Sequence, residues 1–152
     1  DGMIANLSDE ETARFEAFLV PPSIAVLASL NGSGLPQISP IWYRYSEGWV
    51  TMSTVSETVK SRNIVRNGRA LVCVYSEPEA FEYASPSGAV TVIDDDSLWT
   101  ETCAIIDRYE LPEDADKRMR RLEHHNRVIL SLAVDWVHCG RSDVQRETRV
   151  SV

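Results

Sequence analysis

Residues 53–69 constrain the fold more than any other part of the sequence. They lie between two apolar runs, 49–52 and 70–75, whose composition is typical of β-strands. Within residues 53–69 the apolar positions change to helical spacing, and Gly68 stands where a helix would end. The sequence therefore predicts a strand, a Ser/Thr-rich turn, a short helix and a second strand in direct succession.

The same stretch concentrates positive charge and free hydrogen-bond donors. A turn that opens a helix directs backbone N–H groups at one spot, which is suited to an anion. Four positive charges follow in an otherwise acidic chain: Lys60, Arg62, Arg66 and Arg69. These residues leave two interpretations open. One is a site for a phosphate-bearing ligand, and the other is an N-capped connecting helix with a solvated basic face.

Composition narrows the range of partners. The chain has 152 residues, of which 43% are hydrophobic, and a net charge of −8. We expect a single domain over residues 1–152, with Asp1-Gly2 ahead of Met3 as an expression remnant. A nucleic-acid backbone or an anionic membrane surface would need a broad basic face, so we expect neither as a partner.

Several absences and the cysteines favour a cytoplasmic protein. No apolar run approaches the roughly 20 residues that cross a bilayer, and no secretory signal pattern precedes Ser8. The cysteines are odd in number and widely spaced, which suits reduced thiols. They are Cys73, Cys103 and Cys139.

The rest of the chain reads mainly as strands separated by turns. Ser8 and Glu11 form a capping-box pattern before a helix that Pro21-Pro22 ends. Two more helices are expected, one after residues 94–96 with Thr102 on its apolar side, and one from about Glu113. Strands are expected at residues 23–30, 37–45, 49–54, 70–75, 81–84, 89–93 and 127–138.

These elements predict a mainly β (α+β) fold. In the last predicted strand, one face should carry Val128, Leu130, Leu132, Val134 and Trp136. The run 70–75 is apolar on both faces, as in a strand that is covered on two sides. Six or seven mostly antiparallel strands with peripheral helices indicate a small barrel, because closing the sheet removes exposed edges.

Pro40 lies within the predicted strand 37–45. Proline lacks a backbone N–H, so it belongs at a sheet edge or at a bulge. A strand broken at Pro40 would expose the backbone of Ser39, Ile41 and Trp42 to a flat ligand. A plain edge strand is the alternative, and the residues by themselves favour it.

Four segments, taken in order, resemble the split β-barrel flavin and deazaflavin oxidoreductases, a superfamily that includes pyridoxamine 5′-phosphate oxidase. Within it, the resemblance is closest to the actinobacterial proteins that bind coenzyme F420, a 5-deazaflavin. The resemblance implies a six- to seven-stranded antiparallel split β-barrel, and a homodimer whose two cofactor sites are built from both subunits. The segments are residues 24–30, 34–43, 60–70 and 128–138.

The resemblance also implies roles for individual residues. Residues 39–42 match the strand that lies along the cofactor ring, and Lys60 matches the lysine that meets its phosphate. Two positions depart from close F420-binding relatives: Thr58 replaces a second basic residue, and Asn67-Gly68 replaces Asp-Pro. The implied cofactor-binding residues are Ser39, Pro40, Ile41, Trp42, Ser53, Thr54, Val55, Thr58, Val59, Lys60, Arg62 and Asn63.

The sequence contains no recognisable catalytic set. Paired carboxylates, a nucleophile elbow and zinc-ligand spacing are absent, so we assign no catalytic residue and no metal. In this superfamily the cofactor ring transfers the hydride, and the protein binds and orients it.

Three functions stay open. The first is an F420-dependent reductase that acts on a small planar unsaturated or quinone-like substrate. The second is an FMN-dependent oxidase or reductase, and the third is a non-enzymatic binder of a flavin or haem. Residues 94–125 match least, so the substrate stays open.

Overall fold

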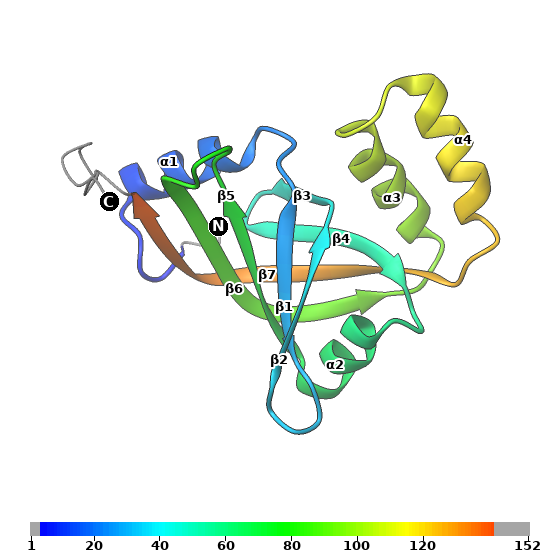
Figure 1. The fold of residues 1–152 in the computed structure, drawn as a ribbon, viewed down its shortest axis with the longest axis horizontal. Coiled ribbons are helices and arrows are strands. Elements are labelled where there is room, and N and C mark those ends of the chain that lie inside the picture. Colours follow the sequence, from blue (N-terminus) through cyan, green and yellow to red (C-terminus); the bar gives the residue numbers. More distant parts are fainter. Residues whose placement is uncertain (1–3, 142–152) are drawn as a thin grey trace, which may run out of the picture.

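The protein is described by a computed structural model over residues 4–141; Asp1-Gly2, interpreted above as a remnant, lies outside the described residues. Within them, seven antiparallel strands form one sheet in the order β2-β1-β5-β6-β7-β4-β3 (Figure 1). In chain order the elements are α1 (Asp9–Leu19), β1 (Ala25–Leu30), β2 (Pro36–Ile41), β3 (Tyr43–Ser46), β4 (Trp49–Val55), α2 (Val59–Asn67), β5 (Arg69–Tyr75), β6 (Glu82–Ile93), α3 (Ser97–Asp107), α4 (Pro112–Leu122) and β7 (Arg127–Arg141).

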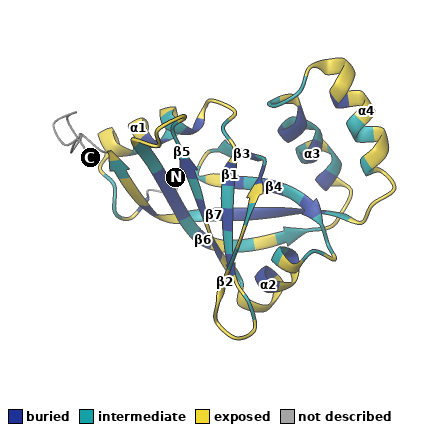
Figure 2. Ribbon diagram, viewed as in Figure 1, coloured by how far each residue is buried: buried dark blue, intermediate teal, exposed yellow. Residues whose placement is uncertain are grey.

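The sheet curls into a half-barrel because its two edges are joined by one residue. β2 and β3 are at opposite edges of the sheet, yet only Trp42 separates them in the chain. The inner face holds the core, with fully buried side chains that include Tyr43, Met52 and Leu130. Residues 128–132, near the start of β7, are buried, whereas much of α4 is exposed (Figure 2). The predicted mainly β, antiparallel split-barrel class is confirmed.

The helices begin and end where local signals predict. Ser8 caps α1, and Glu11 completes the capping box by accepting a hydrogen bond from the Ser8 N–H at 2.8 Å. Gly68 ends α2 in the left-handed conformation at φ 75°, which favours glycine. The helix predicted from about Glu113 begins one residue earlier, at Pro112.

The two strands predicted at 81–84 and 89–93 are wrong, because they form one strand, β6. We interpreted the Pro86 and Gly88 region as a turn, but the ladder with β7 continues through it with a register shift between Ser87 and Gly88. A Cβ at Gly88 would lie 1.7 Å from the carbonyl oxygen of Ala133. Glycine is therefore needed there for close backbone approach at a β-bulge.

The same bulge makes part of the alternation predicted for β7 wrong. Gly88 pairs with Val134 and Ser87 pairs with Trp136, so Asp135 is the extra residue. After it the two faces exchange: Trp136 is 54% exposed and Val137 is 2% exposed. β7 also continues to Arg141 rather than ending at residue 138.

The predicted strand 37–45 divides at Trp42 and not at Pro40. Pro40 stays within β2, pairs with Val26 of β1, and lies on an edge strand, as the proline indicates. β5 also differs from the prediction of a strand covered on both faces. Leu71 is 39% exposed, so one face of β5 is open in the single chain.

Candidate functional site

The N-terminus of α2 carries two free backbone donors beside Lys60. Thr58 caps the helix, and its side chain accepts a hydrogen bond from the Ser61 N–H at 3.4 Å. The hydroxyls of Thr58 and Ser61 both donate to the Val55 carbonyl, at 2.9 and 3.0 Å. Among the described residues, the N–H groups of Val59 and Lys60 have no partner. These two groups are available to an anion.

The loop before α2 is tied to the start of β7. The N–H of Ser56 donates to the carbonyl of Asn126 at 2.8 Å, and the Asn126 side chain donates to Glu57 at 2.7 Å. One residue further on, Arg127 pairs with Val55 in the β4–β7 ladder. The fold thus brings Arg127 to the turn that opens α2, although the two are distant in sequence.

Lys60 and Arg127 are half-buried cations that repel each other. Burial lowers the pKa of Lys60, and the charge of Arg127 lowers it further. Burial also lowers the pKa of Arg127, with a smaller effect from Arg118. Within residues 4–141, neither Lys60 nor Arg127 forms an ion pair. A buried positive charge is costly unless it is paired, so these residues fit an anionic group such as a phosphate.

The other residues of the basic stretch do not join this pair. Asn63 is buried and donates to the Ser29 hydroxyl at 3.2 Å, which fixes α2 against β1. Arg66 donates to the Asn63 side chain at 3.3 Å. Arg69 forms an ion pair with Asp135 at 2.8 Å on the outer surface. Of the four positive charges noted in the sequence, Lys60 is the one whose pKa is lowered by the charge of Arg127.

A cavity of about 180 Å³ adjoins Arg127 between the sheet and the last two helices. Arg127 donates to the Ser53 hydroxyl at 2.9 Å, and this hydroxyl is 3.0 Å from that of the fully buried Thr102 on α3. Arg118 of α4 also lines the cavity. The apolar lining consists of Trp42, Ile105, Ile106 and Leu122.

Trp42, the link between β2 and β3, is held by α4 and by the segment that follows α3. Its indole stacks on the Tyr109 ring with centroids 4.7 Å apart and planes 8° apart, and the Arg118 guanidinium lies 4.7 Å from the indole centroid. The Tyr109 hydroxyl accepts from the Tyr43 N–H at 3.2 Å and donates to the Ser23 carbonyl at 2.8 Å. These contacts fix the backbone around Trp42.

The residues predicted to lie along a cofactor ring occupy the end of β2. Ile41 buries its side chain in the core, so only its backbone is open to a ligand. The Ser39 hydroxyl is buried and has no hydrogen-bond partner, whereas Pro40 is exposed.

The structure brings some of the predicted residues together and separates others. Trp42 and Ser53 come from the two predicted groups, and both line the cavity beside Arg127. Val59 and Arg62 have exposed side chains, and that of Thr54 is buried. Arg127 could not be predicted beside α2 from the sequence, because its position depends on the pairing of β4 with β7. For α3, the sequence offered one sign of a role in the cavity, which is the polar Thr102 on the apolar side of the predicted helix.

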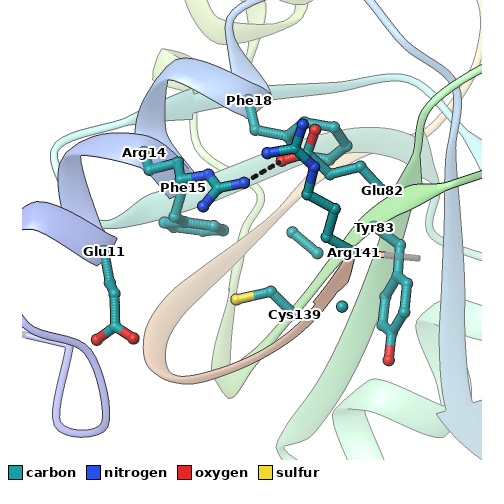
Figure 3. Close-up of a pocket in the computed structure, with 10 residues that line it drawn as sticks. Glu11, Arg14, Phe15, Phe18, Glu82, Tyr83, Cys139 and Arg141 are labelled. Atoms are coloured by element: carbon teal, nitrogen blue, oxygen red, sulfur yellow. Dashed lines mark ion pairs between the residues drawn. The ribbon is translucent and has the colours of Figure 1, made fainter. Parts of the chain in front are cut away.

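A second cavity, of about 200 Å³, lies between α1 and the ends of β6 and β7 (Figure 3). Arg14 forms an ion pair with Glu82 at 3.8 Å, and Glu11 accepts the Ser8 hydrogen bond at the start of α1. Burial raises the pKa of the Cys139 thiol, and Glu11 adds to the effect. In this second cavity Glu11 and Glu82 already have partners, and the raised pKa of Cys139 disfavours its thiolate. The charges of Lys60 and Arg127 beside α2 have no such partners within residues 4–141.

Other site types have no support in residues 4–141. No cluster of His, Cys, Asp and Glu side chains there could hold a metal ion. No described helix is both long and apolar enough to cross a membrane. The three cysteines form no disulfide.

The curled antiparallel sheet with its peripheral helices is a split β-barrel. The family described as pyridoxamine 5′-phosphate oxidase matches residues 11–139. The chain belongs to this family. Among curated protein sequences, none matches the chain.

Solved structures share the fold. A conserved hypothetical protein from Mycobacterium tuberculosis matches with a TM-score of 0.73 at 16% identity, over 89% of this chain and 85% of that chain. An F420 reductase matches with a TM-score of 0.65 at 22% identity, over 81% and 94%. A pyridoxamine 5′-phosphate oxidase-related, FMN-binding protein from Nostoc punctiforme matches with a TM-score of 0.60 at 18% identity, over 88% and 84%. At these identities the similarity establishes the fold.

Proposed function

We propose that this protein is an oxidoreductase that transfers a hydride between coenzyme F420 and a small planar unsaturated or quinone-like substrate. The observation that carries the proposal is the unneutralised pair Lys60 and Arg127 at the N-terminus of α2. The similarity to an F420 reductase and the family membership support the cofactor class.

The start of α2 would hold the phosphate of the cofactor. Lys60 supplies the charge, and the free N–H groups of Val59 and Lys60 supply directed donors. Arg127 raises the positive potential at the same place. Binding a phosphate there neutralises a charge that is otherwise half-buried without a partner.

Residues 39–42 would hold the ring of the cofactor. The backbone groups of these residues would provide its polar contacts. Tyr109 holds Trp42, and therefore the end of this surface, in place. Hydride transfer is the chemistry that the bound cofactor supplies, and the protein's part is to bind, to orient and to exclude water. We assign no catalytic residue.

FMN is the alternative cofactor, supported by the similar fold of an FMN-binding protein. Mass spectrometry of the ligand that co-purifies separates the two, and fluorescence titration with F420 and FMN gives their affinities. Tight binding of F420 with turnover supports the proposal. Tight binding of FMN alone supports the FMN-dependent enzyme. Binding of either cofactor without turnover on quinone-like acceptors supports a non-enzymatic binder.

We also propose that a second copy of this chain covers the outer face of the half-barrel. A row of five uncharged residues crosses five neighbouring strands. Each residue is paired with the next in the sheet, so their side chains lie on the same face. Ile38 and Trp136, at its ends, are 66% and 54% exposed. An apolar groove of about 290 Å³, lined in part by Leu30 and Leu71, lies beside it. The row is Ile38, Ala28, Leu71, Ser87 and Trp136.

A further inference from the structure

The cavity between the sheet and the α3–α4 pair is lined by a polar group of residues and by apolar side chains. The polar group is Arg127, Ser53 and Thr102, joined by hydrogen bonds of 2.9 and 3.0 Å. The apolar side chains include Ile105 and Leu122. A cavity of this kind suits a small ligand that has one polar end and an apolar body.

Of the two arginines that line the cavity, only Arg127 has no ion pair within residues 4–141. Arg118 also lines it, but this guanidinium forms an ion pair with Glu110. Arg127 has no ion pair within residues 4–141; its one hydrogen bond goes to Ser53, and its Nε–H is buried without a partner. One negative charge on a ligand would neutralise it. A carboxylate supplies that charge and fits the planar guanidinium, whereas Lys60, the other unpaired cation, does not line this cavity and is left for the phosphate.

The volume limits the apolar part of the ligand. An apolar cavity of about 150 Å³ in another protein accommodates benzene. The cavity here, at about 180 Å³, has room for one six-membered ring with a small substituent. The faces of the Trp42 indole are covered by Tyr109 and Arg118, so the indole offers its edge, and the aliphatic side chains provide the other apolar contacts that such a ring needs.

We propose that this cavity binds a small aromatic carboxylate, with its carboxylate on Arg127 and Ser53 and its ring against Trp42, Ile105 and Leu122. The inference goes beyond the proposed function, because it requires no cofactor. It also leaves Lys60 and the start of α2 free for a phosphate. Arg127 would then bind the carboxylate, and Lys60 would bind the phosphate.

Calorimetric titration of the purified chain, without added cofactor, tests the site with benzoate as the probe. Benzyl alcohol, which has the ring without the charge, and acetate, which has the charge without the ring, should each bind at least about ten-fold more weakly than benzoate. Inorganic phosphate should not displace benzoate. Equal affinity of acetate and benzoate would overturn the aromatic part, and displacement by phosphate would make the cavity part of the phosphate site.

Variants locate the binding. Arg127→Gln should weaken benzoate binding about ten- to a hundred-fold, since it removes a charge-assisted hydrogen bond. Arg127→Lys should retain part of the affinity. Arg121→Gln, an exposed arginine of α4 outside the cavity, should leave it unchanged.

Thermal unfolding of each variant shows whether it is folded. A folded Arg127→Gln that binds benzoate like the wild type would overturn the proposal. Titration of F420 into Lys60→Ala is a separate measurement, so loss of the cofactor assignment leaves the benzoate result standing.

Discussion

Single residues decide the chemistry at the start of α2, and Lys60 is the first of them. Its side chain is half-buried and is repelled by Arg127. Its own backbone N–H and that of Val59 have no partner in residues 4–141. We propose this arrangement as an anion site. Its cost is recovered only when an anion binds.

Lys60→Ala should weaken binding of the phosphorylated cofactor about ten- to a hundred-fold, because a charge-assisted hydrogen bond contributes roughly 1.5–3 kcal/mol. Fluorescence titration with F420 and FMN measures the loss. Lys117→Ala, in a surface pair with Asp114 on α4, is the matched control and should change little. The loss should be much smaller for a cofactor fragment without its phosphate. Wild-type affinity in Lys60→Ala would contradict the anion site.

The lowered pKa of Lys60 predicts how pH affects the ligand-free protein. The unfolded chain binds this proton more tightly than the folded chain, so the free energy of unfolding gains a contribution as pH rises. The gain begins near the folded-state pKa and is complete above the ordinary value of 10.5. In urea unfolding, the stability of wild type relative to Lys60→Ala should therefore increase over this window. A decrease would show that the lysine has an anionic partner in the folded chain.

At the scale of elements, the attachment of α3 to the sheet depends on Glu101. It accepts two hydrogen bonds from Arg44 of β3, at 2.8 and 2.7 Å, and another from Thr51 of β4. The hydrogen bonds from Arg44 are the main reason that the pKa of Glu101 is lowered. This contact holds the helix that supplies Thr102 to the cavity.

Glu101→Gln should destabilise the protein by about 2 kcal/mol at neutral pH, as expected for hydrogen bonds to a charged group. Because the folded-state pKa is lowered, this contribution is present above the ordinary value of 4.5 and is lost as pH falls through the folded-state pKa below it. Urea unfolding of both proteins from pH 7 downward measures the difference. A difference that persists undiminished at the lowest pH would mean that the charge of Glu101 contributes nothing.

Elements with local signals could be predicted from the sequence, and features of pairing could not. The capping box at Ser8 and the glycine stop at Gly68 identify their helices from a few neighbouring residues. The turn assigned near Gly88 failed because this glycine serves an approach to Ala133, which is visible only once β6 and β7 are paired. Lys60 could be named as a candidate because the signal of its turn is local. Arg127 could not, because its place beside α2 depends on the pairing of β4 with β7.

At the scale of the whole molecule, the half-barrel has an inner face filled by its core and an outer face that is open along β2, β1 and β5. Monomeric proteins rarely expose large contiguous apolar surfaces. The outer row contains Ile38 and Leu71, and the exchange of faces after Asp135 turns Trp136 to the same side. The bulge therefore extends this apolar surface to β7.

We expect a homodimer through this outer face, with roughly 800 Å² buried on each subunit. Leu71→Glu should dissociate it, since a two-fold interface would bury two carboxylates without partners, at a cost of several kcal/mol. Light scattering at micromolar concentration should give a dimer mass for the wild type and a monomer mass for Leu71→Glu. Leu111→Glu, at a 74% exposed position between α3 and α4, is the control and should stay dimeric. A monomeric wild type, or equal dissociation of both variants, would place the interface elsewhere or remove it.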